Sequence, residues 1–551
     1  MKILLVEPGY KNKYPPIGLM KISTYHKQRG DEVVFVKGVE PDFANQYWDR
    51  IYITTLFTFD FKITIDTIKS YKYSVYRTIN LYVGGILASL MPERIASAAG
   101  IPLKQILVGQ LIDSRLLRFR DSINIDELPL DYDILDTITY KYPAGDNYIS
   151  YLTRGCPNHC SFCAVPMLEP KFKITNNIKE QLEFVNKKYG SKQNLLLLDN
   201  NVLNAKEDLK KLIDDLCDAG FGRNAKFIPE SDYGIALRRY RSGDSNEIID
   251  CKIVDFLQQF KYRVTDDSEQ QLFLSFLQDL EVYKEDIGEF LLSTEPLIAP
   301  IVEKYYKPRP KSRYVDFNQG VDARLINDDN MAELARLCIR PLRIAFDNIA
   351  YEKYYVNAVR TACRHGIQQV SNYLLFNYKD KPIELYQRIK VNIELNRELG
   401  INIFSFPMKY SPIDEIDRTY VGVHWNYKYL RAISAILNVT KGIVAAGDSF
   451  FRKAFGENED EFFELLIMPR DMIMFRSFYE NNGMKEEWKA LYNQLTNDWK
   501  QELLKIVSQP DSKIAKANCP IELREILPFY LVNKKNLRNQ SDQLSFQLES
   551  C

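Results

Sequence analysis

A short loop with three cysteines constrains this chain more than any other stretch. Its sequence is Arg-Gly-Cys-Pro-Asn-His-Cys-Ser-Phe-Cys, from position 154 to position 163. Three residues separate Cys156 from Cys160, and two separate Cys160 from Cys163. Such a compact loop can bring three thiolates around one metal centre, and no fourth cysteine follows nearby.

Three thiolates suit some metal sites better than others. A structural zinc site needs four closed ligands, whereas a four-iron cluster held by three thiolates leaves one iron open for an exogenous ligand. Phe162, just before Cys163, offers a small apolar wall beside that ligand. The residues alone leave two alternatives open: a zinc site completed by His159 or by a distant residue, and a loop of cysteines without a metal.

The composition is that of an ordinary globular protein. The 551 residues predict two to four domains, and 46% hydrophobic with 26% charged residues is typical of a soluble chain. Lys+Arg and Asp+Glu both number 73, so the net charge gives no sign of a nucleic-acid-binding surface. The cysteines outside the loop are scattered, which favours a reducing cytoplasm over a disulfide framework. No signal peptide and no membrane-spanning run is recognised.

Strands and helices alternate along most of the chain. Residues 1–125 predict a Rossmann-like, doubly wound parallel sheet, because short apolar strands alternate with amphipathic helices. Residues 126–147 are a linker rich in acidic residues, proline and tyrosine. The loop that follows the first strand, residues 7–14, is expected to shape the top of the next domain or to contact substrate.

The second domain is expected over residues 148–420. Its predicted strands form six βα units and therefore a partial TIM-like barrel, open on one side; they are Tyr148–Thr153, Asn194–Leu198, Tyr314–Asn318, Leu342–Phe346, Gln369–Phe376 and Ile401–Phe406. A helical insertion over residues 222–312 interrupts this rhythm. Residues 421–551 predict a helical C-terminal domain. The fold class is therefore α/β.

The cysteine loop resembles the signature of the radical S-adenosylmethionine (SAM) superfamily, CxxxCxΦC, in which Φ is aromatic. The segments Tyr14–Leu19 and Val83–Ile86 resemble the cobalamin-binding-like domain that precedes many radical SAM cores. This resemblance covers roughly residues 1–440. It implies that Cys156, Cys160 and Cys163 hold a [4Fe-4S] cluster, whose open iron chelates the amino and carboxylate groups of SAM.

The resemblance also implies a SAM pocket at strand ends. Asp199, Asn200 and Asn201 follow the second predicted strand of the barrel, where the family contacts the amino group of SAM. Arg324 is expected to pair with the carboxylate of SAM, since arginine makes forked contacts to carboxylates, and Asp347 to accept from the ribose hydroxyls. The alternatives are a helix N-cap for the first three residues and ordinary salt bridges for the last two. No catalytic residue facing substrate is identified.

The N-terminal domain departs from the family pattern at one position. Cobalamin domains of the base-off type carry DxHxxG after the first strand, and this chain has Glu7-Pro8-Gly9-Tyr10 there. The only histidine in the domain is His26, within a predicted helix, where a surface or hydrogen-bonded role is expected. The sequence therefore argues against cobalamin held through a histidine, and binding without a histidine ligand stays open.

These observations together predict a cytoplasmic radical SAM enzyme. The resemblance implies that SAM is cleaved reductively and that the 5′-deoxyadenosyl radical abstracts hydrogen from a substrate, which is a small molecule, a peptide or RNA. An electron donor such as flavodoxin or ferredoxin is the expected partner. The rival hypotheses are a cobalamin-dependent radical SAM methyltransferase and a non-catalytic iron–sulfur protein with a regulatory or binding role.

Overall fold

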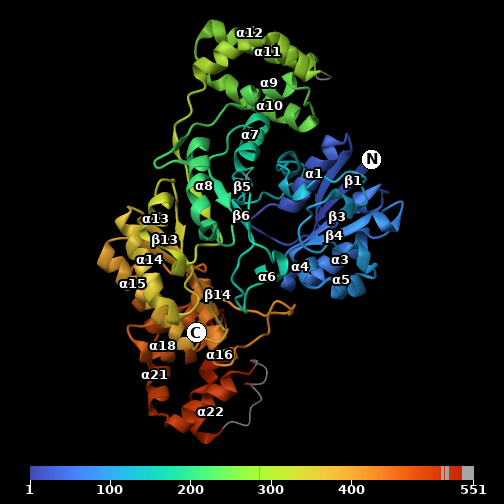
Figure 1. Cartoon of the computed structure of the whole chain (residues 1–551). Helices are drawn as coiled ribbons and strands as arrows, with labels where there is room; N and C mark the ends of the chain where they lie inside the picture. Colours follow the sequence, from blue (N-terminus) through green and yellow to red (C-terminus); the bar gives the residue numbers. More distant parts are fainter. Residues whose placement is uncertain (176, 284–285, 510–513, 515–519, 536–551) are drawn as a thin grey trace, which may run out of the picture. The chain divides into compact units, whose positions relative to one another are not determined.

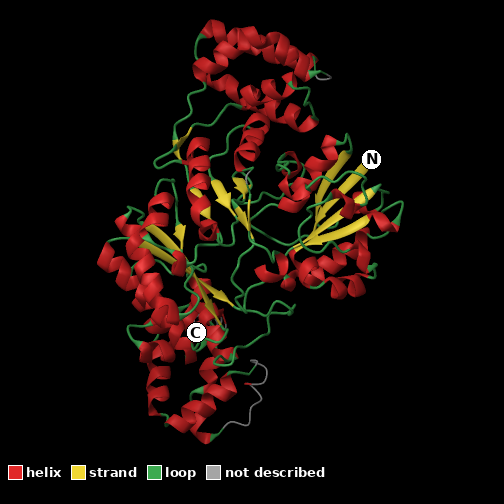
Figure 2. Ribbon diagram, in the orientation of Figure 1, coloured by secondary structure: helices red, strands yellow, loops and turns green. Residues whose placement is uncertain are grey.

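A computed structural model describes residues 1–175, 177–283, 286–509, 514 and 520–535. Parts of the predicted insertion (284–285) and of the predicted C-terminal domain (510–513, 515–519, 536–551) lie outside these described residues. The chain forms two compact units: the first comprises residues 1–319, 332–340 and 413–418, and the second comprises residues 320–331, 341–412 and 419–551. Both mix helices with parallel sheets (Figure 2). The domain boundaries expected from the sequence stay predictions.

The first unit begins with a four-stranded parallel sheet. Its order is β2-β1-β3-β4, with β1 (Lys2–Glu7), β2 (Glu32–Lys37), β3 (Arg50–Thr55) and β4 (Leu81–Gly85). The chain moves outward from β1 to β2 and then crosses back to β3, so the strand order reverses between β1 and β3. The helices between and after these strands are α1 (Ile17–Gln28), α2 (Pro41–Ala44), α3 (Phe61–Tyr71), α4 (Ile86–Leu90) and α5 (Pro92–Ala99).

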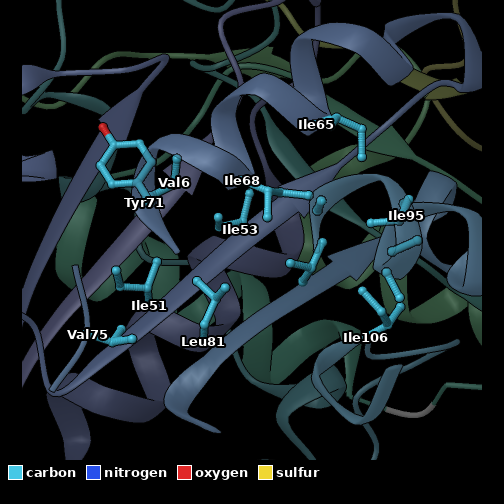
Figure 3. Close-up of a cluster of buried hydrophobic side chains, with 14 of the residues drawn as sticks. Val6, Ile51, Ile53, Ile65, Ile68, Tyr71, Val75, Leu81, Ile95 and Ile106 are labelled. Carbon is cyan, nitrogen blue, oxygen red and sulfur yellow. The ribbon is translucent and has the colours of Figure 1, made fainter. Parts of the chain in front are cut away.

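A continuous apolar cluster stabilises this sheet. Figure 3 shows Val6 of β1 and Ile53 of β3 packed with Ile68 of α3 and Ile95 of α5. The buried residues of α3, at positions 64, 65, 67, 68 and 71, fall on one helix face. Each such side chain contributes roughly 1.5–3 kcal/mol when it is removed from water. The parallel sheet predicted for this part of the chain is present.

A second sheet of the first unit carries the cysteine loop. It has three parallel strands in the order β11-β8-β5, with β5 (Tyr148–Ser150), β8 (Leu195–Leu197) and β11 (Val315–Phe317). A short antiparallel ladder of β6 (Thr153–Arg154) and β7 (Lys173–Ile174) closes the neck of the loop. The helices of this region are α6 (Val165–Leu168), α7 (Ile178–Tyr189) and α8 (Leu209–Leu216).

The segment predicted as an insertion is helical, and two short strands join its ends. Strand β9 (Lys226–Phe227) pairs antiparallel with β10 (Lys311–Ser312). Between them lie α9 (Asp232–Arg241), α10 (Glu247–Phe260), α11 (Asp267–Val282) and α12 (Ile287–Tyr305). These helices have an apolar core of their own, which includes Phe273 and Leu277.

The second unit contains another three-stranded parallel sheet. Its order is β12-β13-β14, with β12 (Leu342–Arg343), β13 (Gln369–Phe376) and β14 (Asn402–Lys409). All six strands predicted for the barrel therefore form, three in each unit, and their closure into one partial barrel stays a prediction. Helix α13 (Asp328–Leu334) precedes β12, and α14 (Glu352–Arg364) and α15 (Pro382–Leu399) follow the strands.

The described residues that follow β14 in the second unit are largely helical, as predicted from residue 421 onward. The helices are α16 (Tyr427–Val439), α17 (Asp448–Phe455), α18 (Glu459–Ile467), α19 (Arg470–Met474), α20 (Arg476–Asn481), α21 (Met484–Gln494) and α22 (Asn497–Val507). Figure 1 labels many of the elements of both units. Among the described residues, no helix has the length and apolar character needed to cross a bilayer.

Candidate functional site

The cysteine loop leaves the β6–β7 ladder through a strained glycine position. Gly155 has φ +75, and a Cβ atom there would lie 2.4 Å from the carbonyl oxygen of Lys171. Only glycine adopts this conformation without strain and without that overlap. Further along the loop, the backbone N–H of Cys163 donates to the carbonyl of Cys160 over 3.0 Å, which forms a tight turn. The sequence therefore sets both the entry and the turn of the loop.

The donor chemistry of the loop suits an iron–sulfur cluster. Cys156, Cys160 and Cys163 lie at half-buried positions, and Phe162, between Cys160 and Cys163, is also half-buried. Thiolates are the ligands that hold such clusters. Across the described ranges, no three or more His, Cys, Asp or Glu side chains are gathered into a group that could hold a metal ion. The ligand assignment therefore rests on the residue types and their spacing.

Asp199 lies two residues after β8, and its carboxylate faces Leu152 and Thr153, just before the cysteine loop. The carboxylate is 1% exposed. Its Oδ1 accepts from the Thr153 backbone N–H at 2.5 Å, the Thr153 hydroxyl at 2.7 Å and the Leu152 N–H at 3.1 Å. Burial raises the pKa of Asp199 to about 6, although the bonds from Thr153 act in the opposite direction. This carboxyl group positions the start of the loop, and its expected contact with SAM stays a prediction.

The next two residues reach the cysteine loop directly. Asn200 Nδ2 donates to Glu169 Oε2 over 2.9 Å. Asn201 is 3% exposed, and its Nδ2 donates to the sulfur of Cys156 over 3.6 Å. The Oδ1 of Asn201 is buried and has no hydrogen-bond partner in the described part of the chain. Asn201 therefore contacts a predicted cluster ligand and keeps one acceptor available.

Glu169 is a residue of this site that the sequence did not reveal. Its Oε2 accepts from the backbone N–H of Gly155 at 2.7 Å, and its Oε1 accepts from Arg154 Nε at 3.0 Å. Arg154 also pairs with Asp126 at 3.1 Å and lies 4.0 Å from the ring centroid of Tyr151. Glu169 thus fixes both residues that precede Cys156. Glu169 belongs to no motif. Its position shortly after Cys163 was the only sequence feature that could have indicated a role beside the cysteine loop.

The N-terminal helix α1 is bound to the same cluster of charges. Lys21 Nζ lies 3.1 Å from Asp126 Oδ1 and 5.5 Å from the ring centroid of Tyr151. Burial lowers the pKa of Lys21, and the carboxylate of Asp126 acts against that shift. Within the first unit, the N-terminal sheet and the base of the cysteine loop therefore share one ion-pair network.

The loop after β1 reaches the strand ends of the second sheet. The hydroxyl of Tyr14 donates to Asn318 Oδ1. Asn318 follows β11, and its backbone N–H donates to the carbonyl of Leu197 in β8 over 2.9 Å. Because Asp199 follows the same end of β8, Tyr14 brings residues 7–14 to the carboxyl edge that carries the candidate site.

The N-terminal domain offers no free imidazole near the loop after β1. Glu7 is buried there and pairs with Lys37 at 2.6 Å. His26 is fully buried in α1, with Nδ1 2.7 Å from Asp31 Oδ2 and Nε2 3.0 Å from the Tyr52 hydroxyl. Burial lowers the pKa of His26 to about 4, although Asp31 opposes this shift. His26 is therefore the hydrogen-bonded helix residue that the sequence indicated.

The last two predicted SAM contacts lie in the second unit. Arg324 makes a forked contact to Asp322, with Nε–Oδ1 at 2.8 Å and Nη2–Oδ2 at 2.6 Å. Burial raises the pKa of Asp347 to about 6, while the fully buried Arg388 opposes the shift. Arg324 is thus engaged in a salt bridge, the alternative that the sequence left open. The grouping of Arg324 and Asp347 with the cysteine loop stays a prediction.

No known protein family matches this sequence, and no curated protein matches it. Solved structures align with it, and two of these are cobalamin-binding enzymes. The radical SAM methyltransferase TsrM from Kitasatospora setae, with cobalamin and a [4Fe-4S] cluster bound, gives a TM-score of 0.42 at 11% identity over 74% of this chain and 72% of that chain. The cobalamin-dependent SAM radical enzyme OxsB, with aqua-cobalamin and SAM bound, gives a TM-score of 0.40 at 12% identity. The alignment covers 92% of this chain and 71% of the OxsB chain. Both neighbours are radical SAM enzymes that bind cobalamin.

Proposed function

We propose that this protein is a radical SAM enzyme. The observation that carries the proposal is the loop of three half-buried cysteines, Cys156, Cys160 and Cys163, with the spacing that brings them together. The β6–β7 ladder closes this loop at its neck, and Asn201 binds the sulfur of Cys156 from the neighbouring strand end. A loop held at both ends and contacted at a sulfur is suited to present three thiolates to one cluster.

In this proposal the residues of the chain have distinct roles. When bound, a [4Fe-4S] cluster supplies the electron that cleaves SAM into methionine and the 5′-deoxyadenosyl radical, which abstracts hydrogen from substrate. Asp199 fixes the start of the loop, Phe162 gives the cofactor an apolar wall, and the free Oδ1 of Asn201 is an acceptor for a donor group of SAM. An external protein such as flavodoxin or ferredoxin delivers the electron. The substrate class is left open.

Anaerobic reconstitution tests this proposal. The purified chain is incubated with iron, sulfide and thiol, and iron content and paramagnetic spectra are recorded. We expect about four irons per chain and, after addition of SAM and dithionite, release of 5′-deoxyadenosine. Alanine replacement of Cys156, Cys160 and Cys163 removes both signals, whereas Cys251→Ala, at an exposed cysteine outside the loop, keeps them. A cluster that survives in the triple variant contradicts the ligand assignment.

The same assay separates the enzyme from a non-catalytic iron–sulfur protein. A regulatory or binding protein would take up the cluster and change its spectrum on reduction, yet would release no 5′-deoxyadenosine with SAM. We propose a reducing, cytoplasmic compartment for this protein, as the scattered cysteines of the sequence indicated.

A second candidate function is a cobalamin-dependent radical SAM methyltransferase. The observation that favours it is an exposed apolar rim after β3 and β4. Phe57 and Phe59 stack with their centroids 4.9 Å apart, and both are exposed, as are Ile86 and Val108. Ligands of parallel α/β sheets bind outside the carboxyl ends of the strands, and this rim suits the apolar face of a large macrocycle.

If cobalamin binds at this rim, we propose that no histidine of the domain ligates its cobalt. Both ring nitrogens of His26 are engaged by Asp31 and Tyr52. Purification with hydroxocobalamin, followed by gel filtration and paramagnetic spectra of the cob(II)alamin form, tests this candidate. A stoichiometric complex without nitrogen hyperfine coupling supports it. Nitrogen coupling that disappears in His26→Gln would instead show that His26 is the lower ligand of the cobalt. If no complex forms, the radical SAM enzyme proposed above works without cobalamin.

A further inference from the structure

A cavity of about 250 Å³ lies between the linker and the insertion helices of the first unit. Its walls are linker residues 132–146, the end of α7, and helices α9 and α10, which Figure 1 shows beside one another. Lys192 enters this cavity from the turn before β8. The Tyr148 N–H donates to the carbonyl of Asn194 at the start of β5 and β8, so the cavity adjoins the amino-terminal edge of the sheet. The cysteine loop follows the opposite, carboxyl edge.

Lys192 is a half-buried cation that lacks an anionic partner. Among the described residues its ammonium group makes no hydrogen bond or ion pair, and it lies 4.7 Å from the ring centroid of Tyr132. Burial lowers the pKa of Lys192, although the carboxylate of Asp146 acts in the opposite direction. A half-buried ammonium group that has no carboxylate within ion-pair distance loses part of its hydration without full compensation, although Asp146 acts on it from farther away. An anion entering the cavity would relieve this cost.

Three other cations line the cavity: Lys141, which is exposed to solvent, and Lys252 and Arg239, which have carboxylate partners. Lys252 Nζ lies 2.5 Å from Asp136 Oδ2. Arg239 makes a forked contact to Asp133, at 2.9 and 2.8 Å. Such pairs have little to gain from a further anion. Lys192 is therefore the cation to which an entering carboxylate would bind.

Part of the wall is apolar and includes four tyrosines. The tyrosine hydroxyls are satisfied outside the cavity: Tyr132 donates to the Asn147 carbonyl at 2.8 Å, Tyr140 to the Asn12 carbonyl at 2.6 Å, Tyr189 to Asp131 at 2.8 Å, and Tyr142 to Glu7. The rings therefore present carbon surface to the cavity, together with Ile235, Ile249 and Ile253. This surface suits an apolar or aromatic ligand body.

Carboxylates in the wall limit the charge of the ligand. Asp136, Asp146 and Asp232 all line the cavity. A polyanion such as a nucleotide or a sugar phosphate would bring several negative charges close to them, which is unfavourable. One carboxylate directed at Lys192 avoids this repulsion.

We propose that this cavity binds a small monocarboxylic acid with an apolar or aromatic body, whose carboxylate pairs with Lys192 Nζ. The linker forms one wall and the insertion helices another, so a bound acid would connect them. This site is independent of the cysteine loop and does not rest on the proposed radical SAM activity.

The test uses the full chain and matched pairs of probes. Benzoate, phenylacetate, indole-3-acetate and hexanoate are each compared with their amides by saturation-transfer NMR and isothermal titration calorimetry. We expect at least one acid to bind with a Kd of about 1 mM or tighter, and its amide to bind about tenfold more weakly or not at all. Binding of none of these acids, or equal binding of acid and amide, overturns the proposal.

Variants of the chain test the role of Lys192. Lys192→Met should weaken binding of the acid about tenfold or more. It should not lower the melting temperature, because it removes a half-buried charge that has no ion-pair partner. Lys192→Arg should retain binding, since it keeps the cation. Lys187→Met is the matched control, because Lys187 is exposed near the end of α7 and does not line the cavity. Unchanged affinity in Lys192→Met, or an equal loss in Lys187→Met, would show that the proposal is wrong.

Discussion

The side-chain amide of Asn201 donates to the sulfur of Cys156 over 3.6 Å, from the end of a neighbouring parallel strand. A hydrogen bond to a thiolate stabilises the state with more negative charge. In an iron–sulfur cluster that state is the reduced one, and hydrogen bonds to sulfur are among the features that set its potential. In the enzyme proposed above, Asn201 would therefore make the cluster easier to reduce.

Replacing Asn201 with leucine, which has a similar volume and no donor, should lower the midpoint potential of the reconstituted cluster. Loss of about 1 kcal/mol of differential stabilisation corresponds to ~40 mV for one electron. A redox titration followed by paramagnetic resonance measures this shift. In the protein without a cluster, the Cys156 thiol should react more slowly with iodoacetamide near neutral pH, because its thiolate has lost a donor.

The neighbouring Asn200 provides the control for this prediction. Its amide donates to Glu169 and not to a sulfur, so Asn200→Leu should leave the alkylation rate of Cys156 unchanged. Equal potentials and equal alkylation rates in the wild type and Asn201→Leu would mean that the Asn201–Cys156 contact is only a packing contact.

Gly155→Ala should destabilise the cysteine loop and reduce iron uptake. The positive φ costs an alanine about 1–2 kcal/mol, and overlap of its Cβ with the carbonyl of Lys171 adds about 1–3 kcal/mol. Gly243→Ala is a matched control, because Gly243 has φ +73 and nothing within 4 Å of an added Cβ. Iron content after reconstitution and thermal denaturation measure the two variants. Similar losses in both would assign the effect to φ alone.

The sequence predicted the strands of the site because each is an apolar run followed by polar residues. The run from Asn194 to Leu198 indicated β8, and the parallel arrangement of the strands placed Asp199 at the carboxyl edge. The spacing of the cysteines identified the predicted ligands. These features are local, since a few consecutive residues specify them.

The contacts within the site were not predictable, because they join residues distant in the chain. Asp199 faces the backbone of Leu152 and Thr153, and Tyr14 binds Asn318 across more than half of the chain. Hydrophobic periodicity fixes which face of a strand is buried, but it does not say which buried donor a carboxylate will meet. Glu169 was missed for the same reason, since its partners become neighbours only when the β6–β7 ladder forms.

Asp199 should make the stability of the first unit depend on pH. Its folded pKa of about 6 lies above the ordinary value of 3.8, so the folded chain binds more protons than the unfolded chain between these pH values. The stabilising contribution is complete below about pH 4 and is lost as the pH rises through 6. Asp199→Asn does not titrate, and its Oδ1 can accept the same three bonds.

We therefore expect Asp199→Asn to match the wild type near pH 4 and to be more stable at pH 8, by up to roughly 3 kcal/mol. Thermal denaturation of the apoprotein across this range measures the difference. Asp208→Asn, at an exposed position in the same segment, serves as the control. A difference between Asp199→Asn and the wild type that stays constant with pH would show that burial does not shift this carboxyl group.

The last prediction concerns Arg324, whose guanidinium already forms a forked contact with Asp322. If Arg324 binds the carboxylate of SAM, that carboxylate must compete with Asp322. Arg324→Ala should then weaken SAM binding about tenfold, as expected for the loss of one charged hydrogen bond. The iron content should stay unchanged. Asp322→Asn should bind SAM as tightly as the wild type or more tightly, because it releases the guanidinium. Equilibrium dialysis of SAM against the reconstituted variants measures both effects. If Arg324→Ala binds SAM as tightly as the wild type, or if Asp322→Asn binds SAM tenfold more weakly, Arg324 and Asp322 form only a structural salt bridge and do not bind SAM.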